Sequence, residues 1–243
     1  MKEPIVYNIY GLSRSGNHAI TFWILHNLSE KYQEIGNQSY ASIDNKVCYL
    51  NNVGKMHHKE INESLYDIVV KSWEDINYVD DNDIVIHRDF LNLLCSKFKA
   101  FNLFLHPIPK KYGGTEYSRF NNSMSVVYEE KFLDILKNII TVWKQHCGAR
   151  NLIKYNLWLK SHEYRNNIAD MVGIPNIVDN IKYISKIGGG SSFGGLKLFD
   201  YNDYTSRYRE VKLPDEFMGH ILDDKELIQL NIDLYDINLT KII

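Results

Sequence analysis

Short runs of apolar residues, mostly β-branched or aromatic, recur along the chain and predict buried strands. The first run is residues 5–10, IVYNIY, and it stops at Gly11. Comparable runs follow at residues 46–50, 67–72, 83–87 and 151–155. We expect these runs to form the sheet of the protein.

Between the strands, apolar residues recur at helical spacing. Ile20, Trp23, Ile24 and Leu28 predict a helix over residues 19–28. Further helices are expected at residues 90–101, 127–147, near 168–172 and within 217–235. Strands that alternate with helices imply an α/β protein with a mostly parallel sheet flanked by helices. A chain of this length is expected to be one domain, residues 1–243.

Composition and charge are those of an ordinary globular protein. The chain is 44% hydrophobic and 24% charged, with a net charge of −2, so a general affinity for nucleic acid or membrane surfaces is not expected. No run approaches the roughly 20 apolar residues of a membrane span, and residues 1–4 lead directly into the first strand. Three cysteines without metal-ligand spacing favour a reducing, cytoplasmic location.

The segment between the first strand and the first helix is the main candidate site. Residues 11–16 form a loop of small and polar residues bounded by Gly11 and Gly16, and it contains Arg14. The first N–H groups of a helix lack intrahelical partners and carry partial positive charge, so such a loop can hold a phosphate or sulfate. The alternative is an ordinary strand-to-helix turn.

Two residues distinguish this loop from the usual nucleotide-triphosphate loop. That loop reads GxxxxGK followed by Ser or Thr, where the lysine contacts phosphates and the hydroxyl binds Mg²⁺. Here Asn17 and His18 stand at those two positions. The sequence therefore favours an anionic group bound without a metal. Adjacent histidines at 57 and 58 lack partners with ligand spacing, and we expect no metal there.

Charged residues follow two later strands, where open α/β sheets bind ligands. Lys71 and Glu74 lie at the end of the third predicted strand, and Arg88 follows the fourth, about two helical turns before Ser96. Because parallel strands end at one edge of the sheet, these groups and Arg14 are expected to surround one crevice. The alternatives are a solvated loop and a local ion pair between Arg88 and its neighbour.

Two irregular segments complete the picture. Residues 184–195 form a glycine-serine loop in which Lys186 could help to bind an anion, although such runs are also flexible tethers. Residues 102–125 form a long loop rich in Tyr, Lys and Asn, and loops of this length are typically lids or binding surfaces. We expect the second loop to face an acceptor.

Taken together, these motifs resemble the PAPS-dependent sulfotransferases, whose donor is 3′-phosphoadenosine 5′-phosphosulfate. The run Ser13-Arg14-Ser15-Gly16-Asn17-His18 resembles the loop that binds the 5′-phosphosulfate in that family. Arg88 and Ser96, eight residues apart, resemble the motif that binds its 3′-phosphate. The resemblance implies a P-loop NTPase-like sulfotransferase fold.

The resemblance also implies roles for residues outside these two motifs. Tyr155 stands where many members have a tyrosine that contacts the adenine, and the late glycine loop resembles one that reaches the 3′-phosphate. In that loop the implied donor-binding residues are Lys186, Gly189, Gly190, Ser191 and Ser192. Many members have a histidine base in a Lys-Thr-His sequence, whereas this chain reads Lys71-Ser72-Trp73-Glu74.

The implied activity is transfer of a sulfuryl group from PAPS to a hydroxyl or amine, releasing adenosine 3′,5′-bisphosphate without a metal. Glycan-directed members commonly use a glutamate base, which makes Glu74 the first choice here, with His18 and His57 as weaker ones. Arg14 would stabilise the leaving group, and Lys71 would sit by the transferring group. A carbohydrate or small molecule is the expected acceptor. A P-loop nucleotide kinase and a non-catalytic nucleotide-binding protein stay open as alternatives.

Overall fold

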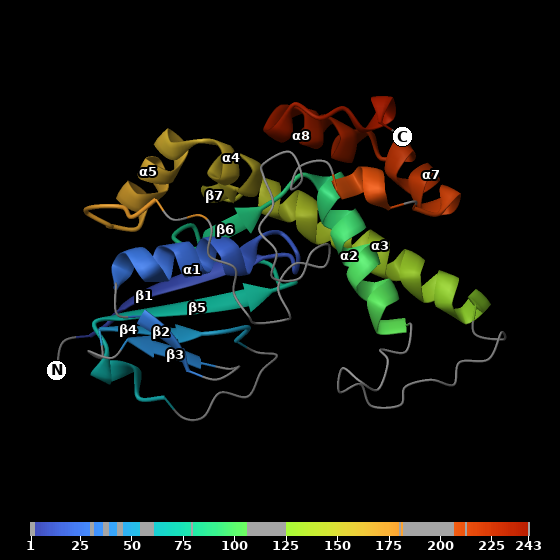
Figure 1. Ribbon diagram of the computed structural model, residues 1–243. Coiled ribbons are helices and arrows are strands. Elements are labelled where there is room, and N and C mark those ends of the chain that lie inside the picture. The colour runs from blue at the N-terminus through green and yellow to red at the C-terminus, as the bar shows by residue number, and fades with distance from the viewer. Residues whose placement is uncertain are drawn as a thin grey trace.

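A computed structural model of the chain is shown in Figure 1. It describes residues 3–29, 32–35, 39–42, 46–53, 61–78, 80–105, 125–179, 181, 207–211 and 213–242. Within these ranges, the side chains of residues 32–35, 39–42, 99–105, 125–132, 207 and 210 are not described.

The described strands form one seven-stranded sheet in the order β2-β3-β4-β5-β1-β6-β7. Their bounds are β1 Ile5–Gly11, β2 Tyr32–Ile35, β3 Ser39–Ser42, β4 Val47–Leu50, β5 Ile68–Glu74, β6 Ile84–His87 and β7 Asn151–Lys154. All neighbours from β4 to β7 pair in parallel, while β2 and β3 add an antiparallel edge. The expectation of a mostly parallel sheet is therefore confirmed.

Helices cover the sheet and close one end of it (Figure 1). The α-helices are α1 Asn17–Leu28, α2 Phe90–Leu105, α3 Ser125–Cys147, α4 Tyr155–Lys160, α5 His162–Met171, α7 Asp215–Asp223 and α8 Lys225–Tyr235. Short 3-10 helices are η1 Glu63–Leu65, η5 Arg207–Glu210 and η6 Leu239–Lys241. The expected strand and helix positions agree with these bounds to within a few residues, which is the usual uncertainty at element ends.

Two hydrophobic clusters hold the helices in place. On one face of the sheet, α1, α4 and α5 pack on inward-facing strand residues such as Ile9, Val70 and Ile86. A second cluster joins α2, α3, α7 and α8, with Phe90 and Trp143 fully buried in it. Since β4 and β6 are buried at every position, their apolar runs match strands covered on both faces.

One part of the sheet was not expected from the sequence. Residues 29–45 are polar and rich in Asn, yet they contain β2 and β3, which pair antiparallel at the edge of the sheet. β2 is the edge strand and β3 lies between β2 and β4; backbone hydrogen bonds hold both strands, so their polar sequences carry a weak signal.

The end of β6 is fixed by a buried histidine. His87 is 1% exposed, its Nδ1 lies 2.6 Å from the hydroxyl of Tyr235, and its Nε2 lies 3.2 Å from the carbonyl oxygen of Trp143. A neutral ring that donates from Nε2 and accepts at Nδ1 satisfies both contacts. Burial lowers the pKa of His87 from its ordinary value to about 3. The strand end therefore needs this histidine to stay uncharged.

We predict that His87 makes stability depend on pH. In the unfolded chain the His87 ring is protonated below about pH 6.5, whereas in the folded chain it stays neutral down to about pH 3. The contribution of the neutral ring to the free energy of unfolding is therefore fully present above pH 6.5 and is lost as pH falls. One such proton contributes about 1.4 kcal/mol per pH unit. The free energy of unfolding, measured with urea at pH values between about 5 and 7, should change less with pH in His87→Gln, by about this amount per pH unit. The exposed-site control His220→Gln should keep the wild-type pH dependence. Equal slopes in all three proteins would contradict the assignment.

Candidate functional site

The loop between β1 and α1 has the backbone of an anion cradle. Arg14 has a φ of 75° and Gly16 a φ of 100°, both in the left-handed region, and the N–H of Ser15 donates to the carbonyl oxygen of Leu12 at 2.9 Å. Gly16 caps α1 without a side-chain hydrogen bond. Successive turns of this kind direct backbone N–H groups toward one point. The first turn of α1 therefore presents its N–H groups to the loop.

Close packing explains both glycines of the loop. A Cβ on Gly16 would lie 2.2 Å from the ring of Tyr155, at the start of α4, and a Cβ on Gly11 would lie 2.0 Å from Oδ1 of Asn17. Asn17 is 4% exposed, and its Oδ1 accepts a hydrogen bond from the hydroxyl of Ser15 at 2.7 Å. Its Nδ2 is buried and has no hydrogen-bond partner among the described residues. A buried donor at the loop is suited to a bound acceptor.

Arg88 directly follows β6, and its side chain contacts the backbone of this loop. Its Nη1 donates to the carbonyl oxygen of Arg14 at 3.4 Å, and its guanidinium lies 5.1 Å from the ring centre of Tyr155. Arg88 is 3% exposed. The structure therefore brings three of the sequence-predicted residues together from β6, α4 and the loop.

Polar groups around Arg88 hold its backbone and its neighbours. Trp143 Nε1 donates to the carbonyl oxygen of Arg88 at 2.8 Å. The fully buried carboxylate of Asp89 accepts from the side chain and backbone of Asn92 and from Nδ2 of Asn156. Asp89 thus caps α2 and ties it to α4, next to Tyr155.

Glu74 ends β5 beside the start of the loop. It pairs with Gly11 in the register of β1 and β5. One carboxylate oxygen lies 3.9 Å from His18 Nε2, and the other accepts from Asn52 Nδ2 at 3.4 Å. Its side chain is 16% exposed. Glu74 and His18 are therefore close together, at the carboxyl end of the central strands.

A buried polar network lies behind Glu74. The hydroxyls of Tyr49 and Ser72 are 2.8 Å apart, and both lie within hydrogen-bond distance of Asn51 Oδ1. The hydroxyl of Ser72 also accepts from the N–H of Asn52 at 2.9 Å, which fixes the residue that contacts Glu74. Asn51 and Asn52 have no sequence pattern that marks them, because only the folded chain brings β4 beside β5.

Two further charged residues lie at the loop, and neither was assigned a role from the sequence. Lys97 Nζ, on α2, lies 2.6 Å from the hydroxyl of Ser13 and 2.7 Å from Oδ1 of Asp75. That same oxygen accepts the N–H of Ser13 at 2.9 Å. Lys97 directly follows Ser96, which is 3% exposed on α2. In the sequence, the signal for Lys97 is its position next to Ser96, and the signal for Asp75 is its position next to Glu74.

The structure does not bring Lys71 to the loop. Side chains alternate between the two faces of a strand, and Lys71 shares the face of Val69, opposite Val70 and its cluster with α1. Its Nζ pairs with Glu63 at 2.9 Å. The expectation that Lys71 lies beside Arg14 is corrected accordingly.

Several predicted residues lie outside the described part of the chain. They are His57 and the late-loop residues Lys186, Gly189, Gly190, Ser191 and Ser192. Most of the irregular segment, residues 106–124, is also outside it. Their expected roles stay predictions.

The cysteines are poorly suited to nucleophilic chemistry. All three are free thiols. Burial raises the pKa of Cys48 to about 11 and the pKa values of Cys95 and Cys147 to about 12. Because the thiolate is the reactive form, these side chains are inert at neutral pH. Over the described residues, neither a cluster of His, Cys, Asp or Glu with metal-site geometry nor a helix able to cross a membrane is present.

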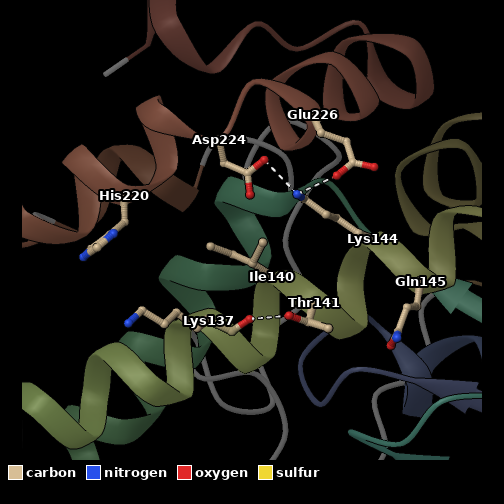
Figure 2. A pocket seen from close by; sticks show the side chains of 8 residues that line it. All are labelled: Lys137, Ile140, Thr141, Lys144, Gln145, His220, Asp224 and Glu226. Atoms are coloured by element: carbon tan, nitrogen blue, oxygen red, sulfur yellow. Dashed lines mark hydrogen bonds and ion pairs between the residues drawn. The ribbon is translucent and has the colours of Figure 1, made fainter.

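Two surface pockets lie away from the loop. One, of about 520 Å³, is shown in Figure 2, where Lys144 on α3 reaches between Asp224 and Glu226. The other, of about 500 Å³, is lined mainly by apolar residues of α2 and α7, including Leu91 and Met218. Neither contains a residue of the loop, so the candidate site rests on side-chain geometry rather than on pocket size.

No family model matches the chain, and no curated protein matches its sequence. Among solved structures, the chain is similar to mouse sulfotransferase SULT7A1 complexed with PAP, over 100% of this chain and 90% of that one. The TM-score is 0.45 and the identity 12%. Values this low establish no family, and the function must follow from the site.

We predict that Gly16→Ala destabilises the protein and disrupts the loop. The new Cβ would meet the ring of Tyr155 in a left-handed backbone, a conformation that costs a non-glycine residue about 1–3 kcal/mol. Gly219→Ala is the matched control, because it has open space in α7, where Ala is favoured over Gly by about 1 kcal/mol. Urea unfolding should show opposite shifts for the two variants. An unchanged free energy of unfolding in Gly16→Ala would refute the described packing.

Proposed function

We propose that this protein is a PAPS-dependent sulfotransferase, which transfers a sulfuryl group from PAPS to a hydroxyl or amine of an acceptor. The observation that carries the proposal is the meeting of Arg88 with the loop at Arg14, where Nη1 lies 3.4 Å from the carbonyl oxygen. This contact brings Arg88 next to the backbone of Arg14, which supports the proposal that the two residues bind opposite ends of one nucleotide. Had they faced separate surfaces, the proposal would have failed.

The loop favours a sulfonucleotide over a nucleoside triphosphate. Asn17 and His18 replace the lysine and the hydroxyl residue that serve a triphosphate and its Mg²⁺. The buried Nδ2 of Asn17, which lacks a partner among the described residues, supports an anion held at the start of α1. A P-loop nucleotide kinase, which needs both missing groups, is less well supported.

In this proposal, each end of the donor has its own residues. The N–H groups at the start of α1, together with Ser13, Arg14 and Ser15, hold the 5′-phosphosulfate. Arg88 and Ser96 hold the 3′-phosphate, helped by residues 186–192. Tyr155, whose ring packs on Gly16, lies beside the adenine. A guanidinium suits the phosphate because its planar N–H groups match two phosphate oxygens.

The proposed transfer is a direct displacement. A bond forms between the acceptor oxygen and the sulfur, while the bond from that sulfur to the 5′-phosphate oxygen breaks. Negative charge collects on the departing phosphate, which Arg14 and the loop N–H groups stabilise; each such donor contributes about 10²–10³ in rate. The proton of the acceptor hydroxyl passes to Glu74. The products are the sulfated acceptor and adenosine 3′,5′-bisphosphate.

Glu74 is the proposed base because of its surroundings. Its carboxylate is mostly shielded from water at the strand end and is oriented by Asn52 at 3.4 Å. His18, 3.9 Å away, is a second group that can share the proton. Lys71, paired with Glu63, has no place in this mechanism. The acceptor we propose is a carbohydrate or another polar hydroxyl compound, and the proposed location is the cytoplasm.

We predict selective, metal-independent binding of adenosine 3′,5′-bisphosphate. Calorimetry should detect this nucleotide without Mg²⁺, and ATP should bind much more weakly with or without Mg²⁺. Arg88→Gln removes a charged hydrogen-bond donor, which is worth about 1.5–3 kcal/mol, or roughly 10- to 100-fold in affinity. Tight, Mg²⁺-dependent binding of ATP would instead identify a nucleotide kinase.

A buried arginine elsewhere provides the control for Arg88→Gln. Arg165 is 6% exposed and pairs with Asp179 and the carbonyl oxygen of Trp158. Arg165→Gln should lower stability but leave the affinity of the folded protein for the bisphosphate unchanged. Unchanged affinity in Arg88→Gln would remove Arg88 from the donor site.

We predict that Glu74→Gln abolishes most turnover while donor binding persists. General-base catalysis typically contributes about 10²–10⁴-fold, and the amide cannot accept the acceptor proton. The measurement is release of adenosine 3′,5′-bisphosphate from PAPS with a panel of sugars, phenols and amines. Glu63→Gln is the control and should keep wild-type turnover, because Glu63 lies in η1 and pairs with Lys71 away from the loop. Full activity in Glu74→Gln would exclude it as the base.

A further inference from the structure

We propose that Lys97 contacts the sulfuryl group of the donor and that Asp75 is a positioning residue for its ammonium. The inference deepens the proposed function and rests on it. The usual triphosphate loop has a lysine after its second glycine, whereas Asn17 follows Gly16 here. Lys97 lies on α2 and would supply this cation from outside the loop.

Contacts with Ser13 and Asp75 place the ammonium at the loop. Lys97 Nζ lies 2.6 Å from the hydroxyl of Ser13 and 2.7 Å from Oδ1 of Asp75. The lysine side chain is 15% exposed and that of Asp75 is 29% exposed. The cation is therefore held at the loop with limited access to water, where its interaction with an anion is stronger than on an open surface.

Asp75 is itself tied to the loop. Its N–H donates to the carbonyl oxygen of Gly11 at 3.0 Å, its backbone is left-handed with a φ of 59°, and its Oδ1 accepts the N–H of Ser13. A carboxylate in this place would repel an anionic donor if it stood alone. Pairing with Lys97 offsets that charge and fixes the ammonium relative to the loop.

The contacts of Lys97 favour an interaction with the sulfuryl group during its transfer. Ser13 belongs to the loop proposed to hold the leaving phosphate, and Asp75 directly follows Glu74, the proposed base. An in-line displacement moves the sulfuryl group from the loop toward the acceptor beside the base. In this proposal, a cation held between Ser13 and Asp75 stabilises the sulfuryl oxygens throughout the transfer.

A purely structural role makes a different prediction. If Lys97 only ties α2 to the loop, its loss should weaken both nucleotides alike. If it contacts the sulfuryl group, its loss should weaken PAPS, which carries that group, more than adenosine 3′,5′-bisphosphate, which does not. The ratio of the two affinities therefore separates the roles without knowledge of the acceptor.

The experiment measures both dissociation constants by calorimetry for the wild type and for Lys97→Met, Lys97→Arg and Asp75→Asn. Lys97→Met should weaken PAPS about tenfold or more relative to the bisphosphate, as expected for one charged hydrogen bond. Lys97→Arg should restore part of the ratio, and Asp75→Asn should reduce it by a smaller factor. Lys144→Met, which removes another ion-paired lysine, is the control and should keep the wild-type ratio.

The outcomes distinguish this inference from the proposal beneath it. Failure of the wild type to bind either nucleotide would refute the proposed function. Wild-type binding with an unchanged ratio in Lys97→Met, or equal weakening of both nucleotides, would refute the role of Lys97 alone. If Lys97→Met does not fold, the same ratio in Lys97→Arg and Asp75→Asn decides the question, and unchanged ratios in both overturn it.

Discussion

The arrangement of the site depends on how a buried guanidinium is accommodated. Arg88 is almost fully removed from water, and a charge in that position needs compensating contacts. It lies over the ring of Tyr155 and donates to the carbonyl oxygen of Arg14. That carbonyl belongs to a residue in the left-handed region, so the contact also stabilises the backbone of the loop. One charge thus joins β6, α4 and the turn before α1.

The sequence predicted the strands that are apolar and missed the strands that are polar. The apolar, β-branched and aromatic runs of β1, β4, β5, β6 and β7 are typical of buried strands, so these strands could be predicted from the sequence. The polar segments of β2 and β3 carry no such signal, because an edge is held by backbone pairing. Tyr155 was expected to end a strand but begins α4, a boundary error of one residue.

In the candidate site, contacts between sequence neighbours could be predicted, whereas contacts between residues far apart in the sequence could not. The contacts within residues 11–18 arise from neighbours in sequence, so the loop could be recognised from its glycines and Arg14. Lys97 meets Ser13 across 84 positions and Asp75 meets it across 62, and no local pattern encodes such pairs. Lys71 was misplaced for a simpler reason: a strand turns successive side chains to opposite faces, so proximity in sequence to Glu74 did not mean proximity to the loop.

The distribution of charge has a consequence for selectivity. In the usual triphosphate loop, the lysine is part of the loop itself, so the motif carries its own cation. Here the cations near the loop come from different elements: Arg14 from the turn, Arg88 from the end of β6 and Lys97 from α2. Their spacing is set by the packing of the sheet and helices rather than by the loop sequence. In the proposed reaction, discrimination between a bisphosphorylated sulfonucleotide and a triphosphate is therefore a property of the fold, and substitutions that move α2 relative to β1 should alter it without touching the loop.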